Sequence, residues 1–278
     1  MMFVASVALY LTVRKSSLIK TPNYLTNLAM FAIPLAVYVV MGLINSSSLS
    51  INWWQAIILV VTAVVFAYGG NKTSLYAIDT APNPGYSLVL SKSYVLFTTI
   101  VAVTLLGAEL TTQKAIAILF IVAFSALIML TRKGAKEAKS DKWFLLSFCA
   151  CFAWGMWSLS SKYLFNHGLD TIAFLIYLYT LVTLCIVSID KVKVSKIKEI
   201  PKNAKLLLLG TGIFSTLFNL GQFQAIRLAP NVGYVNAINA ASIAAVTVFA
   251  AIMFKDELTP RKTIGILGVV VGLILLLI

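Results

Sequence analysis

Two lysines, Lys72 and Lys92, lie inside long apolar stretches of the sequence. A charge at the centre of a bilayer costs about 3 kcal/mol on insertion scales, so such a side chain faces a polar cavity or reaches an interface. Lys92 lies near the middle of its stretch, and no acidic residue lies at a depth suited to pair with it. We therefore expect the anionic group of a bound small molecule as its counter-ion. Lys72 fits a site and an interfacial position equally well.

Uncharged polar and aromatic side chains accompany these lysines. The amides would line a solute site or join neighbouring helices by hydrogen bonds, and the sequence favours neither reading. Trp154 and Trp157 lie in mid-stretch rather than at an interface, so they would line a cavity wall or pack against lipid and core. The candidate substrate-binding residues are Lys92, Lys72, Asn71, Tyr94, Asn219, Gln222, Asn236, Asn239, Trp154 and Trp157.

Metal and cofactor chemistry finds little support in the sequence. Cys149, Cys151, Cys185 and the single histidine, His167, do not form a set with zinc-ligand spacing. No nucleotide-binding motif or catalytic constellation is present. We therefore predict no metal site, no cofactor and no enzymatic activity.

One alternative from another class stays open. Lys92 is flanked by Ser91 and Ser93, and a Ser/Lys pair can supply a nucleophile and its base. On this alternative the chain is a membrane-embedded enzyme or a lipid-handling protein. The pairing requires a hydroxyl within hydrogen-bond reach of the lysine amine, which sequence proximity alone does not establish.

Composition indicates a membrane protein. Hydrophobic residues make up 60% of the chain, charged residues 11%, and the mean hydropathy is +0.94. Soluble domains carry roughly 25% charged residues. The formal net charge of +13 does not indicate a nucleic-acid partner, because the basic residues lie in short loops between apolar stretches. The expected partners are the lipid bilayer and a small-molecule substrate.

The elements that must position the candidate residues are ten membrane-spanning helices of 17 to 26 residues each, close to the length of about 20 residues that crosses a bilayer. The chain is therefore predicted to be an all-α membrane protein. The predicted spans are 1–17, 24–45, 53–78, 83–106, 113–131, 143–163, 170–189, 204–226, 231–254 and 261–278.

An internal duplication organises these spans. Residues 81–86, Ala-Pro-Asn-Pro-Gly-Tyr, recur as Ala-Pro-Asn-Val-Gly-Tyr at 229–234, and Glu-Leu-Thr at 109–111 recurs at 257–259, both at one offset (229 − 81 = 148). Because each copy holds five spans, an odd number, the second copy enters the membrane from the opposite side. We predict two inverted five-helix repeats, 1–131 and 143–278, joined by a basic linker loop at 132–142.

Basic residues also predict an orientation. Loops after odd-numbered spans carry most of the Lys and Arg, whereas those after even-numbered spans carry Lys114, Lys162 and Arg227. The positive-inside rule places the first set in the cytoplasm and both termini outside a cell membrane.

The repeated turns, Gly107-Ala108-Glu109-Leu110-Thr111 and Lys255-Asp256-Glu257-Leu258-Thr259, together with two five-helix halves, resemble the EamA family of the drug/metabolite transporter superfamily. The resemblance covers nearly the whole chain. It implies a secondary transporter that moves a small organic solute by alternating access, with both termini in the cytoplasm, opposite to the charge rule. Lys92 favours an anionic or zwitterionic solute, such as an amino acid or an organic acid.

A stripe of glycines marks the last span. Gly265, Gly268 and Gly272 are three and four residues apart, which suits close helix packing inside the chain or a homodimer.

Overall fold

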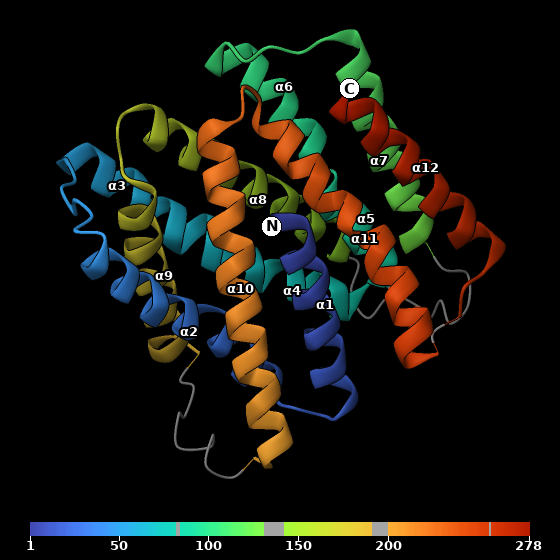
Figure 1. The fold of residues 1–278 in the computed structure, drawn as a ribbon, viewed down its shortest axis with the longest axis horizontal. Helices are drawn as coiled ribbons and strands as arrows, with labels where there is room; N and C mark the ends of the chain where they lie inside the picture. Colours follow the sequence, from blue (N-terminus) through green and yellow to red (C-terminus); the bar gives the residue numbers. More distant parts are fainter. Residues whose placement is uncertain (82–83, 131–141, 191–199, 256) are drawn as a thin grey trace.

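The computed structural model describes residues 1–81, 84–130, 142–190, 200–255 and 257–278, and these residues form helices joined by turns and short loops. Figure 1 shows the helices gathered into a single bundle, with helices of the first and second halves interleaved. The linker predicted at 132–142 falls outside the described residues except for Lys142.

Each half supplies five helical spans. In the first half they are α1 (Met2–Leu18), α2 (Asn23–Ile44), α3 (Trp53–Val61) continued by the π-helix η1 (Thr62–Gly69) and α4 (Gly70–Thr80), α5 (Pro84–Lys92) with α6 (Tyr94–Leu106), and α7 (Thr112–Met129). In the second half they are α8 (Trp143–Asn166), α9 (Thr171–Ser188), α10 (Lys202–Leu228), α11 (Val232–Phe254) and α12 (Pro260–Leu277). These bounds confirm the predicted spans to within a few residues.

Within the described residues, nine helical spans are long and apolar enough to cross a membrane. The remaining one, α1, has 17 residues and packs along α10 and α11. Large apolar side chains such as Leu43, Leu105, Leu206 and Ile252 are mostly exposed on the outside of the bundle. A surface of this kind is stable against lipid rather than water, which fits an all-α membrane protein.

Helix ends recur at the same offset in both halves. Leu18 and Asn166 end α1 and α8, and Leu106 and Phe254 end α6 and α11, each pair 148 positions apart. The starts of α2 and α9, of α5 and α11, and of α7 and α12 keep the same offset. The duplication seen in the sequence is therefore also present in the local structure. Superposition of whole halves as inverted repeats stays a prediction.

The repeated turn has the same local geometry in both copies. Gly107 and Lys255 end their helices in the left-handed region, with φ of 63° and 56°. Thr111 and Thr259 then begin the next helix, because each side chain accepts a hydrogen bond from the backbone N–H three residues later, at 3.3 Å. This is helix N-capping by threonine, and it explains why the Glu-Leu-Thr sequence occurs twice.

The glycine stripe of α12 packs inside the chain. A Cβ at Gly265 would lie 2.6 Å from Cγ1 of Ile128, and one at Gly268 would overlap the ring of Phe124, both on α7. Small residues here let the two helices approach closely. Of the two uses predicted for the stripe, close packing is the one seen, and the homodimer stays a prediction.

Two spans depart from regular α-helix beside the bundle centre. The third passes through the π-helix η1, where Thr62 Oγ1 donates to the Ile58 carbonyl at 2.7 Å and contacts Ser160 Oγ of α8 at 3.0 Å. The fourth is interrupted at Ser93, whose ψ of −4° separates α5 from α6. Irregular helical turns are concentrated at functional sites. The first leads into Asn71 and the second directly follows Lys92.

Connections separate onto two faces of the bundle. In Figure 1 the α1–α2 connection (residues 19–22) lies toward the lower edge, whereas the α6–α7 and α10–α11 connections (residues 107–111 and 229–231) lie at the upper edge. These loops follow one odd-numbered and two even-numbered spans, and they lie at opposite edges of the bundle in this view. Which face is cytoplasmic stays a prediction.

Candidate functional site

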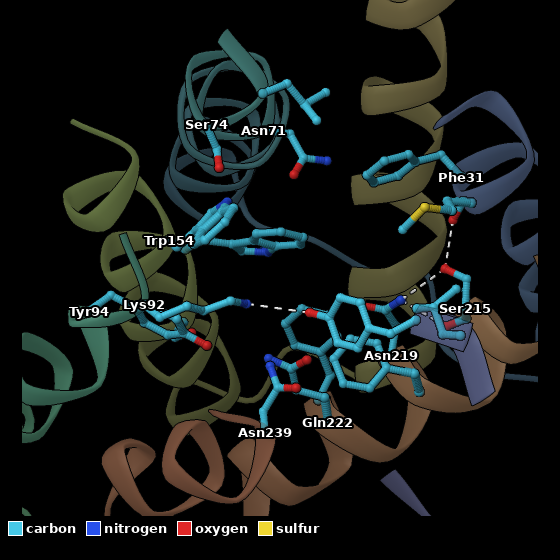
Figure 2. Close-up of a pocket in the computed structure, with 18 of the residues that line it drawn as sticks. Phe31, Asn71, Ser74, Lys92, Tyr94, Trp154, Ser215, Asn219, Gln222 and Asn239 are labelled. Atoms are coloured by element: carbon cyan, nitrogen blue, oxygen red, sulfur yellow. Dashed lines mark hydrogen bonds between the residues drawn. The ribbon is translucent and has the colours of Figure 1, made fainter. Parts of the chain in front are cut away.

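A central cavity of about 280 Å³ lies among the helices of both halves. Ligand pockets start at roughly 300 Å³, so this cavity suits a small solute. Figure 2 shows polar and aromatic side chains converging on it from several helices. Its lining comprises Leu9, Tyr10, Met30, Phe31, Asn71, Ser74, Leu75, Ile78, Leu88, Lys92, Tyr94, Trp154, Trp157, Ser158, Tyr179, Ser215, Phe218, Asn219, Gln222, Phe223 and Asn239.

Lys92 reaches this cavity from the C-terminal end of α5. The break at Ser93 ends α5 there, and a cation at a helix C-terminus is stabilised by the exposed carbonyl dipoles. The Lys92 ammonium donates to the Tyr10 hydroxyl at 3.4 Å, the contact drawn across the centre of Figure 2. The Lys92 side chain thus lines a cavity in this structure, and its binding of a solute stays a prediction.

Three aromatic rings surround the Lys92 ammonium. Its Nζ lies 4.8 Å from the ring centre of Trp154, 5.9 Å from that of Tyr10 and 6.0 Å from that of Tyr94. The Tyr94 and Trp154 rings also meet edge-on at 6.1 Å. Aromatic faces attract a cation without neutralising it, so the ammonium keeps its charge available to a bound anion.

Amide side chains of α4, α10 and α11 supply most of the remaining polarity. Asn219 donates through Nδ2 to the Ser215 carbonyl at 2.8 Å and to Ser215 Oγ at 3.2 Å, which leaves its Oδ1 as an acceptor. Asn239 accepts from Ser6 of α1 at 3.2 Å. Asn71 and Gln222 have no hydrogen bond to another described side chain or backbone group, so their amides are available to a solute.

The cavity wall repeats at the offset of the duplication. Residues that share a position in the two repeats line the same cavity from opposite halves. These pairs are Leu9 and Trp157, Tyr10 and Ser158, Phe31 and Tyr179, Asn71 and Asn219, Ser74 and Gln222, and Leu75 and Phe223. A site built in this way lies where the repeats meet, as in transporters made of inverted halves.

Asn236 has a different place from the other candidates. It is fully buried and lies outside the cavity wall. Its Nδ2 donates to Thr98 of α6 at 3.1 Å, and its Oδ1 accepts from Ser158 of α8 at 3.4 Å. In this structure Asn236 joins three helices, which is the second of the two roles considered for the amides.

Lys72 also lies outside the central cavity. Its Nζ pairs with Asp190 Oδ1 at 2.6 Å and contacts the Tyr68 hydroxyl at 3.2 Å. Lys72 therefore has an acidic partner, Asp190, which follows the seventh span, and this contact fits the interfacial position rather than the solute site considered for Lys72. The pair lines a small side pocket that shares Phe31, Asn71 and Leu75 with the central cavity.

Trp154 and Trp157 both line the cavity, which is the less expected of their two predicted roles. Trp157 packs against Phe223 of α10 with ring centres 5.9 Å apart. Its indole Nε1–H is buried without a hydrogen-bond partner among the described residues. A buried donor left unpaired is unusual in a folded protein and is consistent with an acceptor supplied by a ligand or water.

Sequence reasoning missed several residues of the wall. The Tyr10 hydroxyl accepts a hydrogen bond from Lys92. The rings of Phe31 and Tyr179 face each other with ring centres 5.4 Å apart. Ser215 accepts a hydrogen bond from Asn219. The signal that could have found two others is the offset itself. Shifting two predicted residues, Trp157 and Gln222, back by 148 positions gives Leu9 and Ser74 of the cavity wall.

The Ser/Lys pairing required by the alternative reading is not seen. Ser91 donates to the Leu88 carbonyl at 3.3 Å and Ser93 to the Val89 carbonyl at 2.8 Å. Both hydroxyls are therefore turned toward their own helix, as serines inside helices often are. The Lys92 amine contacts Tyr10 instead of either serine.

His167 and the three cysteines do not line the cavity. The His167 ring packs on Tyr163 and Trp54 at ring-centre distances of 4.2 and 5.4 Å. Among the described residues, no group of three His, Cys, Asp or Glu could hold a metal ion.

Helical spans of membrane length around a solute-sized cavity, lined by aromatic, aliphatic and polar side chains, define a multi-pass membrane protein. The model of the EamA-like transporter family matches residues 141–278, the second repeat, and the chain belongs to this family. It is therefore a membrane transporter, as the resemblance of its repeated turns implied.

Two further likenesses agree with this assignment. A protein of Archaeoglobus fulgidus named "Uncharacterized transporter" is 24% identical over 230 residues, which cover 82% of this chain and 78% of that protein. A solved structure described as "Crystal structure of protein" aligns with a TM-score of 0.76 over 99% of this chain and 94% of its own, at 15% identity. The second likeness concerns the fold alone.

Proposed function

We propose that the chain is a secondary transporter that moves a small organic solute across the cell membrane by alternating access between its two halves. The solute is anionic or zwitterionic, such as an amino acid or an organic acid. The observation that carries this proposal is the cavity walled by equivalent residues of both repeats, with Lys92 as its charged group. The bilayer and the solute are the partners that this function requires.

The position of the cavity supports alternating access. Asn71 and Leu75 belong to one half, and Asn219 and Phe223 belong to the other. A change of access to such a cavity would need movement at the contacts between the halves, because the most extensive helix packings, those of α7 with α12, α1 with α10 and α2 with α10, join one half to the other. Rocking of repeats around a fixed central site is a common transporter mechanism.

Reconstitution tests the proposal directly. Purified protein in liposomes preloaded with an unlabelled mixture of amino acids and organic acids should accumulate the labelled form of its solute by exchange, and protein-free liposomes should not. Lys92→Ala should abolish the exchange, whereas Lys15→Gln, which removes an exposed charge from α1, should preserve it. Failure of every anionic and zwitterionic solute to exchange would refute the proposed function.

A further inference from the structure

The charge of the central cavity is uncompensated. Lys92 is the one charged side chain among the described residues that line it, and the others are amides, hydroxyls, rings and aliphatic groups. The charge remains in place because the contacts of its ammonium are a tyrosine hydroxyl and three aromatic rings. A cavity with a single positive charge is complementary to a solute with a single negative charge.

The second repeat does not add an opposite charge. The residue equivalent to Lys92 is Ala240, whereas the neutral amide Asn71 is matched by Asn219. The duplication has thus kept neutral hydrogen-bonding groups on both sides of the cavity and a charge on one side only. An ammonium group on the solute would meet the positive potential of Lys92 with no carboxylate of the described wall to offset it.

The unpaired polar groups fit a carboxylate with neutral hydrogen-bonding substituents. Lys92 has donors left beyond the one that Tyr10 accepts, and the indole N–H of Trp157 is a buried donor without a partner in the described part of the chain. The amides of Asn71 and Gln222 donate and accept, so they suit a hydroxyl or carbonyl on the solute. A phosphate group is matched less well, because it usually requires more than one cation or the fork of an arginine.

We propose that the solute is an organic monocarboxylate without an ammonium group, and that the cavity rejects the same skeleton when it carries one. This narrowing rests on the proposed transport function. It distinguishes hydroxy or oxo acids from amino acids, which share a carboxylate and differ in net charge. The aromatic wall around the carboxylate subsite leaves room for an apolar remainder of the solute.

Matched pairs of solutes test this selectivity in the intact protein. Lactate and alanine, 2-hydroxyisocaproate and leucine, and 3-phenyllactate and phenylalanine differ by a hydroxyl in place of an ammonium group. In competition for exchange, the hydroxy acid of a responding pair should reach half-inhibition at a concentration at least about tenfold lower. Ligand-induced shifts of the thermal unfolding midpoint should rank each pair in the same order.

Variants assign the selectivity to Lys92. Lys92→Gln should reduce the difference within a pair to about twofold or less by removing the positive potential, and Lys15→Gln should keep the wild-type ratio. If Lys92→Gln fails to fold, the comparison of hydroxy acids with amino acids in the wild-type protein still decides whether the cavity prefers a monocarboxylate.

The outcomes of these experiments distinguish the monocarboxylate inference from the proposed transport function. Amino acids that compete as well as their hydroxy acids would overturn the monocarboxylate inference while leaving transport intact. Tighter competition by a phosphate monoester or by an amine of the same skeleton would also overturn the inference. Exchange of no carboxylate of either kind would refute the proposed function itself.

Discussion

Asn71 and Asn219 are 148 positions apart in the sequence, and they line one cavity from α4 and α10. Figure 2 shows their amides entering from different sides of the space into which Lys92 projects. The two residues differ in one respect. Asn219 is held by hydrogen bonds to Ser215, whereas Asn71 has none to the described residues. Equivalent positions of the two repeats therefore share a location and differ in how firmly they are held.

This difference predicts different effects of two equivalent substitutions. Asn71→Ala and Asn219→Ala should each raise the half-saturating solute concentration about 2- to 10-fold, because each removes one hydrogen bond to the solute. Asn219→Ala should also lower the free energy of unfolding by about 0.6 kcal/mol, since it loses the bond to Ser215. Asn45→Ala, at the exposed end of α2, is the control. Equal stability losses at positions 71 and 219 would contradict the prediction.

Lys92 should be required for binding and not for folding. Lys92→Ala should weaken solute binding roughly 10-fold or more, since a hydrogen bond to a charged group is worth about 1.5–3 kcal/mol. The thermal unfolding midpoint without solute should hold or rise, because the desolvated charge is removed. Lys92→Arg should restore part of the binding, as a guanidinium keeps the charge and changes the donor geometry. Solute binding is measured by the solute-induced thermal shift. A Lys92→Ala variant with the same shift as the wild type would contradict the prediction.

The Tyr10 hydroxyl should position the Lys92 ammonium. Tyr10→Phe keeps the ring 5.9 Å from the ammonium and removes the hydroxyl that accepts at 3.4 Å. We expect a loss of binding of a few-fold, smaller than for Tyr10→Leu, which also removes the ring. Tyr76→Phe, on the exposed side of α4, should leave solute affinity unchanged. Identical affinities for Tyr10→Phe and Tyr10→Leu would show that the ring makes no contribution.

Much of this architecture could be predicted from the sequence because its signals are local. Apolar stretches of membrane length mark the spans, and the repeated Glu-Leu-Thr marks turns that begin at Gly107 and Lys255. Asn71, Lys92 and Asn219 stand out because polar side chains are conspicuous in such stretches. Their location in the cavity wall follows from the same argument that selected them.

The rest depended on contacts between distant segments. Lys72 and Asp190 are 118 positions apart, and nothing in either stretch indicates that Asp190, two residues after the end of α9, contacts Lys72 of α4. Asn236 resembles the cavity amides in sequence, yet its neighbours Thr98 and Ser158 occupy both ends of its amide. A periodic pattern shows which helix face is polar, but it does not show which helix meets that face.

The close packing of α7 and α12 should tolerate no side chain at Gly268. Gly268→Leu would place atoms into the ring of Phe124, and overpacking of this kind costs about 1–3 kcal/mol. Gly210→Ala is a matched control, since a Cβ there has nothing within 4 Å, and it should hold or raise stability through better helix propensity. Chemical denaturation in detergent measures both. A Gly268→Leu variant as stable as the wild type would mean that α7 and α12 can move apart without loss of stability.

The ion pair of Lys72 and Asp190 joins the two halves at the side pocket, and its energy should be small. Its oxygen and nitrogen are 2.6 Å apart, but the side chains are 58% and 27% exposed, and exposed pairs contribute about 0.2–1 kcal/mol. A double-mutant cycle with Lys72→Ala and Asp190→Ala should give a coupling free energy of that size from thermal unfolding. The reversed pair, Lys72→Asp with Asp190→Lys, should recover most of the stability that either single reversal loses.

Because Lys72 does not line the central cavity, Lys72→Ala should leave the solute-induced thermal shift unchanged, in contrast to Lys92→Ala. Equal losses of solute binding in these two variants would mean that the side pocket and the central cavity form one binding site.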